Sequence, residues 1–224
     1  MTALLSNNLF RYLSFLFIFC LWSFLDGCVS PACRMHPEFE LRARSIERPL
    51  LMPPDVKIYE SLPGGMTILR DDWSALGQAN LGDAVLKTFR EKNCEVKMLD
   101  PYVSEPEEIE AIQSVYKAVN KSIRLQAYGP QSASEDQRSF AYSIGPIKEI
   151  LLEHEADSMI FVCGLERVSK AGSRAIVNLA VADPSGTIIW YSVEGSRGDA
   201  CLSDTDNTEK LVKDLIGSFP EVGG

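Results

Sequence analysis

Apolar residues recur along the chain at two spacings, and these spacings predict its secondary structure. Alternation over 56–60 predicts a strand with one wet face, and the run over 158–168 predicts a central strand covered on both faces. After Asp71 and Asp72, which can cap a helix, apolar residues every fourth position predict a core-facing helix. The same reasoning predicts strands at 50–52, 95–99, 174–182 and 187–193, and helices at 105–128, from 146, and at 211–219.

The order of these elements is strand, helix, strand, inserted helix, helix, three strands and a final helix, which predicts the α/β class with a mixed β-sheet flanked by helices. The inserted helix belongs to a helical insertion over about 104–139. Its apolar seam from Ile109 to Ile123 needs burial. We expect it to be either a lid on this domain or a docking surface for a partner.

The amino-terminal residues have the pattern of an export signal. Arg11 is followed by thirteen residues, Leu13 to Leu25, that are apolar except for two serines. A membrane span needs about 20 apolar residues, so a removable signal peptide over 1–27 is favoured over a permanent span. Residues 28–47 carry prolines and scattered charge and predict a tether, which leaves a single domain over 48–224.

The end of the signal resembles the lipobox of bacterial lipoproteins in the sequence Leu25-Asp26-Gly27-Cys28. The resemblance implies cleavage before Cys28 and membrane attachment through acyl chains such as palmitate on that cysteine. Asp26 departs from the pattern, and the alternative is an ordinary secretory signal; Cys33 is a poorer second lipidation candidate. Val29 is not the aspartate that retains many lipoproteins at the inner membrane, so the resemblance implies the periplasmic face of the outer membrane.

In the mature chain, which lacks Cys20, four cysteines remain if Cys28 is acylated: Cys33, Cys94, Cys163 and Cys201. Three complete disulfide pairings are then possible, and the sequence does not separate them. Cys163 lies in an apolar run and is expected to act as a small buried hydrophobe. No zinc site is expected, because there is no closely spaced cysteine pair and the chain has only two histidines.

Charge and motifs argue against several functions. The net charge of −9 makes the chain a poor nucleic-acid binder. It has no Gly-x-Ser-x-Gly motif, and the glycine clusters at Gly64-Gly65 and 195–198 are expected to form turns rather than phosphate loops. We therefore expect no cofactor and no catalytic set.

Three further groups are expected to be structural. His154 is predicted to lie at a helix end, where a cation is favoured, with a catalytic base as the alternative. Trp73 and Trp190 are expected in the core. An acidic group is expected to cap a helix rather than to bind calcium, with Asp206 as the cap; it comprises Asp199, Asp204, Asp206, Asn207 and Glu209.

Three local sequences resemble the domain shared by the TolB amino-terminal region, the curli secretion lipoprotein CsgG and the LpoB type of penicillin-binding-protein activator. They are Gly145 to Val162 with Ala156-Asp157 before the strand, the turn from Asp183 to Gly186, and Ile188-Ile189-Trp190. The likeness covers roughly residues 48–219 as topology. Two features depart from it: Glu155 replaces a usual glycine, and the helix of 105–128 separates elements that are normally joined more directly.

The resemblance implies a non-enzymatic, lipid-anchored periplasmic protein that binds another envelope protein and supports or regulates an envelope assembly, such as cell wall synthesis, secretion or transport machinery. One alternative is an envelope enzyme with a site around His154 and nearby carboxylates. The third is an oligomeric secretion-channel component, which is least favoured because the insertion is helical in period and not strand-forming.

Overall fold

The computed structural model describes residues 32–44, 46–100, 105–128, 140–198 and 202–220. The signal peptide, Cys28 and Cys201 lie outside these residues, so the expectations placed on them stay predictions.

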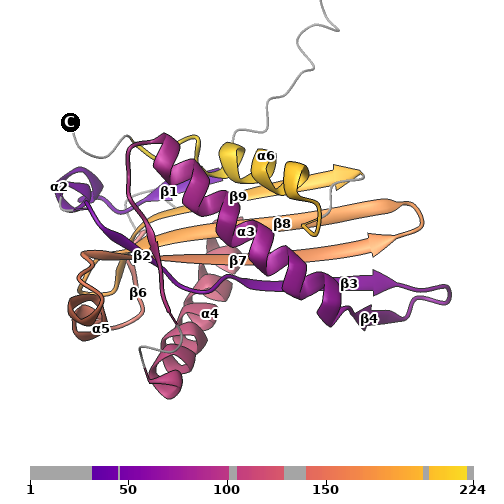
Figure 1. Cartoon of the computed structure of the whole chain (residues 1–224), viewed down its shortest axis with the longest axis horizontal. Coiled ribbons are helices and arrows are strands. Elements are labelled where there is room, and N and C mark those ends of the chain that lie inside the picture. The colour runs from indigo at the N-terminus through magenta and orange to yellow at the C-terminus, as the bar shows by residue number, and fades with distance from the viewer. Residues whose placement is uncertain (1–31, 45, 101–104, 129–139, 199–201, 221–224) are drawn as a thin grey trace, which may run out of the picture. The chain divides into compact units, whose positions relative to one another are not determined.

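A nine-stranded mixed sheet forms the centre of the described residues (Figure 1). Its main path runs β1-β9-β8-β7-β2-β5, with β3 and β4 joined beside β7 and β6 joined to β9. The strands are β1 (Ala32–Met35), β2 (Pro49–Leu51), β3 (Asp55–Ser61), β4 (Thr67–Leu69), β5 (Lys97–Met98), β6 (Tyr142–Ser143), β7 (Ser158–Ser169), β8 (Gly172–Ala182) and β9 (Thr187–Gly198).

The predicted mixed sheet is confirmed by the pairing directions. β7, β8 and β9 form an antiparallel meander, and β2 and β3 run parallel to β7. β2 pairs with the first residues of β7, and β3 pairs with the second half of β7. The single long strand β7 therefore sets the positions of both β2 and β3.

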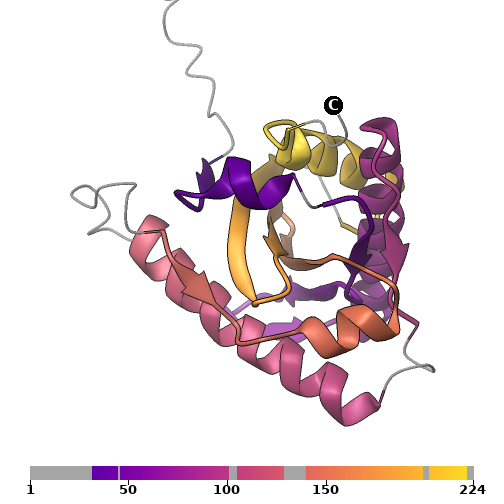
Figure 2. The ribbon, with the colours of Figure 1, turned by 90° about the vertical axis from the view of Figure 1, so that its left-hand side faces the viewer.

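Helices cover both faces of this sheet. The helices of the described residues are α2 (Phe39–Ala43), α3 (Asp71–Glu91), α4 (Pro106–Tyr128), α5 (Lys148–Glu153) and α6 (Thr205–Ile216). One core cluster joins α3 and α6 to the sheet, and a second joins α4 and α5 to its other face. Figures 1 and 2 show the sheet between these two pairs of helices.

The two tryptophans differ in burial. Trp190 is fully buried and its ring lies edge-on to Phe219 with a centroid distance of 5.1 Å, as expected of a core residue. Trp73 is only partly buried. The guanidinium of Arg70 lies 3.9 Å from the Trp73 ring centroid, which is a cation–π contact that keeps one face of the indole covered.

The inserted helix α4 lies on its own domain as a lid. Ile109, Tyr116 and Ile123 are buried in the second core cluster. The Tyr116 ring stacks on Phe161 of β7 at a centroid distance of 4.3 Å and an interplanar angle of 16°. The seam is therefore occupied by the sheet of the same chain.

The segment expected to be a tether is partly structured, which corrects the prediction for residues 32–43. β1 pairs antiparallel with β9, and α2 buries Phe39. Arg42 of α2 also forms an ion pair with Asp183 in the turn between β8 and β9. These elements have four and five residues, too few for a hydrophobic period to be recognised in the sequence.

Two helix caps also differ from expectation. The N-cap of α6 is Asp204, whose carboxylate accepts a 2.9 Å hydrogen bond from the backbone N–H of Asn207; Asp206 lies in the first turn. The N-cap of α3 is Arg70, without a side-chain capping bond, and Asp71 and Asp72 occupy the first turn. At that position carboxylates still interact favourably with the helix dipole.

The residues before β7 explain two features of the Gly145 to Val162 segment. Glu155 has φ of 54°, the left-handed region that glycine adopts at least cost, so a glycine would suit this position. The Asp157 carboxylate accepts backbone N–H bonds of 2.8 Å from Glu47 and 2.7 Å from Arg48. Asp157 thereby fixes the entry to β2 beside β7.

Candidate functional site

The face of the sheet that carries α4 is not fully covered, because the long strands extend beyond this helix (Figure 1). Cationic side chains gather on the uncovered part and on the adjacent side of α4. We call this surface the basic face; its cations are Lys57, Lys117, Lys121, Arg124, Arg167, Arg174 and Arg197.

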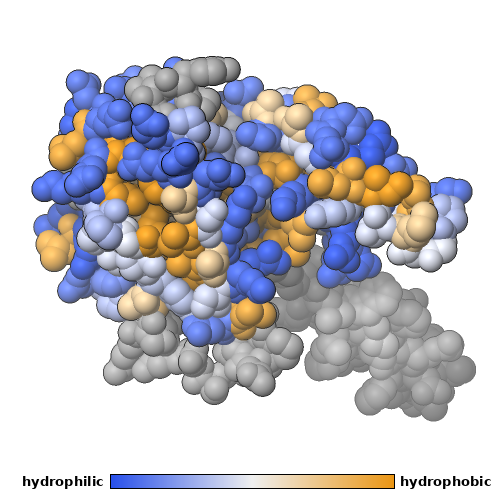
Figure 3. All heavy atoms as spheres, turned by 90° about the horizontal axis from the view of Figure 1, so that it is seen from below, coloured by the Kyte–Doolittle hydropathy of each residue, from blue (hydrophilic) through white to orange (hydrophobic). Residues whose placement is uncertain are grey.

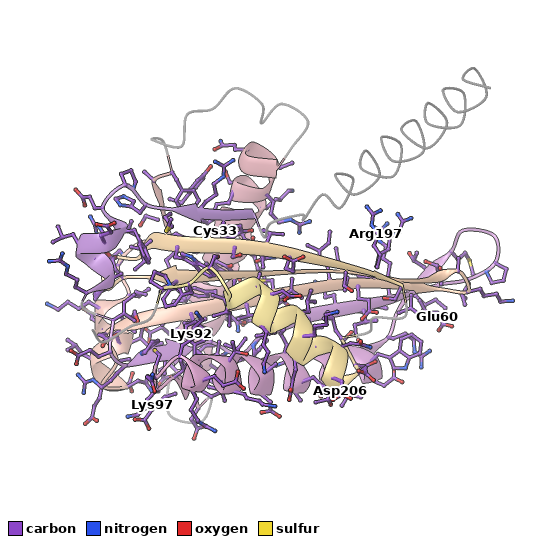
Figure 4. All side chains as sticks on the ribbon, turned by 90° about the horizontal axis from the view of Figure 1, so that it is seen from above. Cys33, Glu60, Lys92, Lys97, Arg197 and Asp206 are labelled. Carbon is purple, nitrogen blue, oxygen red and sulfur yellow. The ribbon has the colours of Figure 1, made fainter. Side chains whose placement is uncertain are left out.

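Three of these cations form a row across neighbouring strands. Arg167 of β7 is directly opposite Arg174 of β8, and Arg174 is directly opposite Arg197 of β9. All three side chains are exposed. Figure 4 shows Arg197 at the outer end of β9, with Cys33 of β1 further back along the same sheet edge. Like charges at directly opposite positions of a sheet repel one another, so this row costs stability unless an anion lies beside it.

Apolar side chains lie next to the arginine row. One step inward, Leu165 is paired with Ile176, and a further step inward Asn178 is paired with Val193. Ile176 is 37% exposed, although it lies on a strand of the sheet. Figure 3, which views the molecule from below, shows hydrophobic atoms framed by hydrophilic ones on this side.

The basic face deepens into a groove where α4 meets the sheet. The groove has a volume of about 760 Å³ and is lined by both elements. Lys117, Lys121 and Arg124 come from α4, and Lys57 comes from β3. Asp55 is the carboxylate among the lining residues, and its oxygen lies 3.2 Å from Nζ of Lys117. The groove thus combines an apolar floor with a net positive wall, which suits an anionic ligand with an apolar part.

Buried polar side chains hold the wall of the groove in place. The Tyr191 hydroxyl donates a 2.6 Å hydrogen bond to Oδ1 of Asn120 on α4, and the Tyr116 hydroxyl donates a 3.3 Å bond to Oδ1 of Asn178 on β8. Cys163, at the groove floor, has its pKa raised to about 12, chiefly by burial. It is therefore a protonated thiol at neutral pH and not a nucleophile.

Of the residues singled out in the sequence, Cys163 lines this groove, whereas His154, Asp204 and Glu209 lie elsewhere. His154 is the C-cap of α5, as its predicted helix-end position required. Glu209 forms an ion pair with Lys87 at 2.7 Å, while Asp204 caps α6. Cys33, Cys94 and Cys163 are free thiols.

In the residues that the structure describes, no group of three or more His, Cys, Asp or Glu side chains is arranged to hold a metal ion. None of the helices in the described ranges combines the length and apolar composition that a membrane crossing requires.

Sequence reasoning missed the basic face, because each strand contributes only one of its cations. Arg167, Arg174 and Arg197 each occupy an outward position of a predicted strand or its extension. Their convergence depends on strand register, which only the structure provides.

No family model matches this chain, and no curated protein matches it significantly. Among solved structures, this chain is similar to two structures of the PelC dodecamer from Paraburkholderia phytofirmans, one of them of a single-residue variant. The identities are 11% and 10%, and the TM-score is 0.41 for both. These matches cover 80% and 86% of this chain and 92% and 96% of theirs. The LpoB C-terminal domain from Salmonella enterica matches at 9% identity and a TM-score of 0.28, covering 73% of this chain and 95% of that domain.

Proposed function

We propose that this chain is a non-enzymatic protein of the cell envelope, anchored by acyl chains on Cys28 at the periplasmic face of the outer membrane. It binds an anionic component of the envelope through the basic face. By that binding it supports or regulates an envelope assembly, such as cell wall synthesis, secretion or transport machinery.

The arginine row is the observation that carries this proposal. Arg167, Arg174 and Arg197 lie side by side on a surface of a chain whose net charge is −9. Directly opposed like charges on a sheet are destabilising by up to about 1 kcal/mol for each pair. An anion bound beside the row removes that cost, so the row supports a binding role for this face.

Complementation of a deletion strain tests the binding role. A triple variant with Arg167→Gln, Arg174→Gln and Arg197→Gln should lose function at normal protein abundance. The matched control carries Arg90→Gln, Lys148→Gln and Lys210→Gln, which remove the same charge from exposed positions on α3, α5 and α6. Full complementation by the first variant would contradict the proposed function.

The anchor is tested separately by incorporation of radiolabelled palmitate. Label should enter the wild-type protein and be lost in Cys28→Ser. Undiminished labelling of Cys28→Ser would overturn the assignment, and labelling lost only in Cys33→Ser would move the anchor to Cys33.

A further inference from the structure

We infer that the anionic component bound by the basic face is the phospholipid surface that holds the anchor. The inference rests on the proposed function, because it takes Cys28 as the acylated residue. Beyond the proposed function, the inference names the ligand of the basic face, which is the phosphate-bearing headgroups of anionic phospholipids.

The covalent chain keeps the basic face close to the anchor. Ala32 is the first residue of β1 and pairs with Val193, which lines the groove. Ala32 lies four positions after Cys28 in the sequence, and a fully extended chain over four positions spans at most roughly 14 Å. An acylated Cys28 therefore holds the membrane surface within reach of the strand edge where the basic face lies.

Charge decides which side of the domain faces that surface. The seven cations of the basic face and the Asp55 carboxylate of its groove together carry a charge of +6, so the rest of the chain, whose total is −9, carries −15. An anionic membrane attracts the face and repels the remainder. Clusters of about four to eight Lys and Arg side chains beside a membrane are a recognised signature of anionic-lipid binding.

The apolar residues of the groove also suit a phospholipid surface. Leu125 of α4 is 64% exposed, and Ile176 is partly exposed on the sheet, both among the residues lining the groove. Lys117, Lys121 and Arg124 line the groove together with Leu125 on one side of α4, so their charged ends can contact phosphates while their methylenes contact apolar groups. A lipid headgroup with its glycerol region offers both kinds of contact.

Vesicle flotation tests the inference without the acyl chains. The protein is the mature chain of residues 28–224 with Cys28→Ser, which keeps every residue that the structure describes. It is mixed with vesicles of phosphatidylcholine alone or with 30% phosphatidylglycerol. We expect binding only to the anionic vesicles, and we expect 0.5 M salt to abolish it, because the Debye length is then about 4 Å.

The same assay identifies the binding surface. Each cation near an anionic membrane contributes about fivefold in affinity, so the triple variant of Arg167, Arg174 and Arg197 should bind roughly a hundredfold more weakly. The control triple variant of Arg90, Lys148 and Lys210 should keep most of the binding of the unchanged chain, because these positions lie on other elements than the basic face. Circular dichroism and thermal unfolding confirm that each variant is folded.

Three outcomes would overturn the inference. One is equal binding to both kinds of vesicle, and another is anionic binding that both triple variants retain. The third is no vesicle binding while the arginine variant still fails in complementation. In that third case the proposed function stands and the partner of the face is an acidic protein segment, so the failures of the two proposals are distinguishable.

Discussion

Tyr191 of β9 donates a buried 2.6 Å hydrogen bond to Asn120 of α4. The bond ties the inserted helix to the antiparallel part of the sheet, and it lies directly beneath the groove wall that carries Lys117 and Lys121. The inserted helix is thus attached by polar as well as apolar contacts.

Removing this hydrogen bond should destabilise the protein. In Tyr191→Phe the buried Asn120 carbonyl loses its donor, which costs about 1–3 kcal/mol of the free energy of unfolding. Urea denaturation measures the loss. The control is Tyr142→Phe, which removes a hydroxyl bonded to Gln126 at an exposed position. A loss no larger than that of the control would show that the buried bond contributes little.

Replacing residues 104–139 by a flexible linker should abolish cooperative folding. The replacement removes Ile109, Tyr116 and Ile123 from the second core cluster and exposes the apolar sheet face that they cover. Denaturant unfolding followed by far-UV circular dichroism, together with binding of a hydrophobic dye, measures the effect. A replacement that unfolds in one sharp transition without binding dye would show that α4 is dispensable for the fold.

Neutralising the centre of the arginine row should stabilise the free protein. Arg174→Gln removes two cross-strand repulsions, with Arg167 and with Arg197, so the free energy of unfolding should rise by a few tenths of a kcal/mol at low salt. The gain should shrink in 0.5 M salt, where charges are screened. Arg90→Gln on α3 is the control. A destabilised Arg174→Gln variant would mean that the arginine makes a favourable contact instead.

Stability should fall in alkaline solution because of two thiols, the buried Cys94 and the partly buried Cys163. Burial raises the pKa of Cys94 to about 11 and that of Cys163 to about 12, whereas both are near 9.0 in an unfolded chain. Above pH 9 the unfolded chain releases these protons and the folded chain keeps them, so the free energy of unfolding decreases as the pH rises towards 11. The variant Cys94→Ala/Cys163→Ala should show a shallower decrease between pH 8 and 11. An identical slope would contradict this account.

Changing His154 to Gln should leave function intact. His154 is the C-cap of α5, and it is absent from the residues that line the groove. Complementation of a deletion strain at matched abundance is the measurement. Loss of function in His154→Gln would favour an enzyme with a site around this residue.

The long elements could be predicted from the sequence because each carries many repeats of its hydrophobic period. The predicted helix after Asp71 and the predicted strand over 158–168 agree with α3 and β7. The short elements β1, α2, β4 and β6 have two to five residues, which is at most two repeats of the strand or helix period. Their positions follow from tertiary pairing with β9, β3 and neighbouring turns.

The candidate site was less predictable than the fold. Lys117 and Arg124 are ordinary helix cations in the sequence, and nothing local indicates that they face Lys57 across a groove. The arginine row requires the register of three strands at once. A one-residue shift of any strand would turn its arginine to the opposite face.

The edge strand β1 also has a mechanical consequence. Any tension that reaches the domain through the residues before Ala32 falls first on the β1–β9 ladder and then on the ion pair between Arg42 and Asp183. A pull along the strand axis loads the ladder bonds together in shear, whereas a pull across it breaks them in turn. The strength of the domain's attachment therefore depends on the direction of the force, with the ion pair as a second point of resistance once the strand has detached.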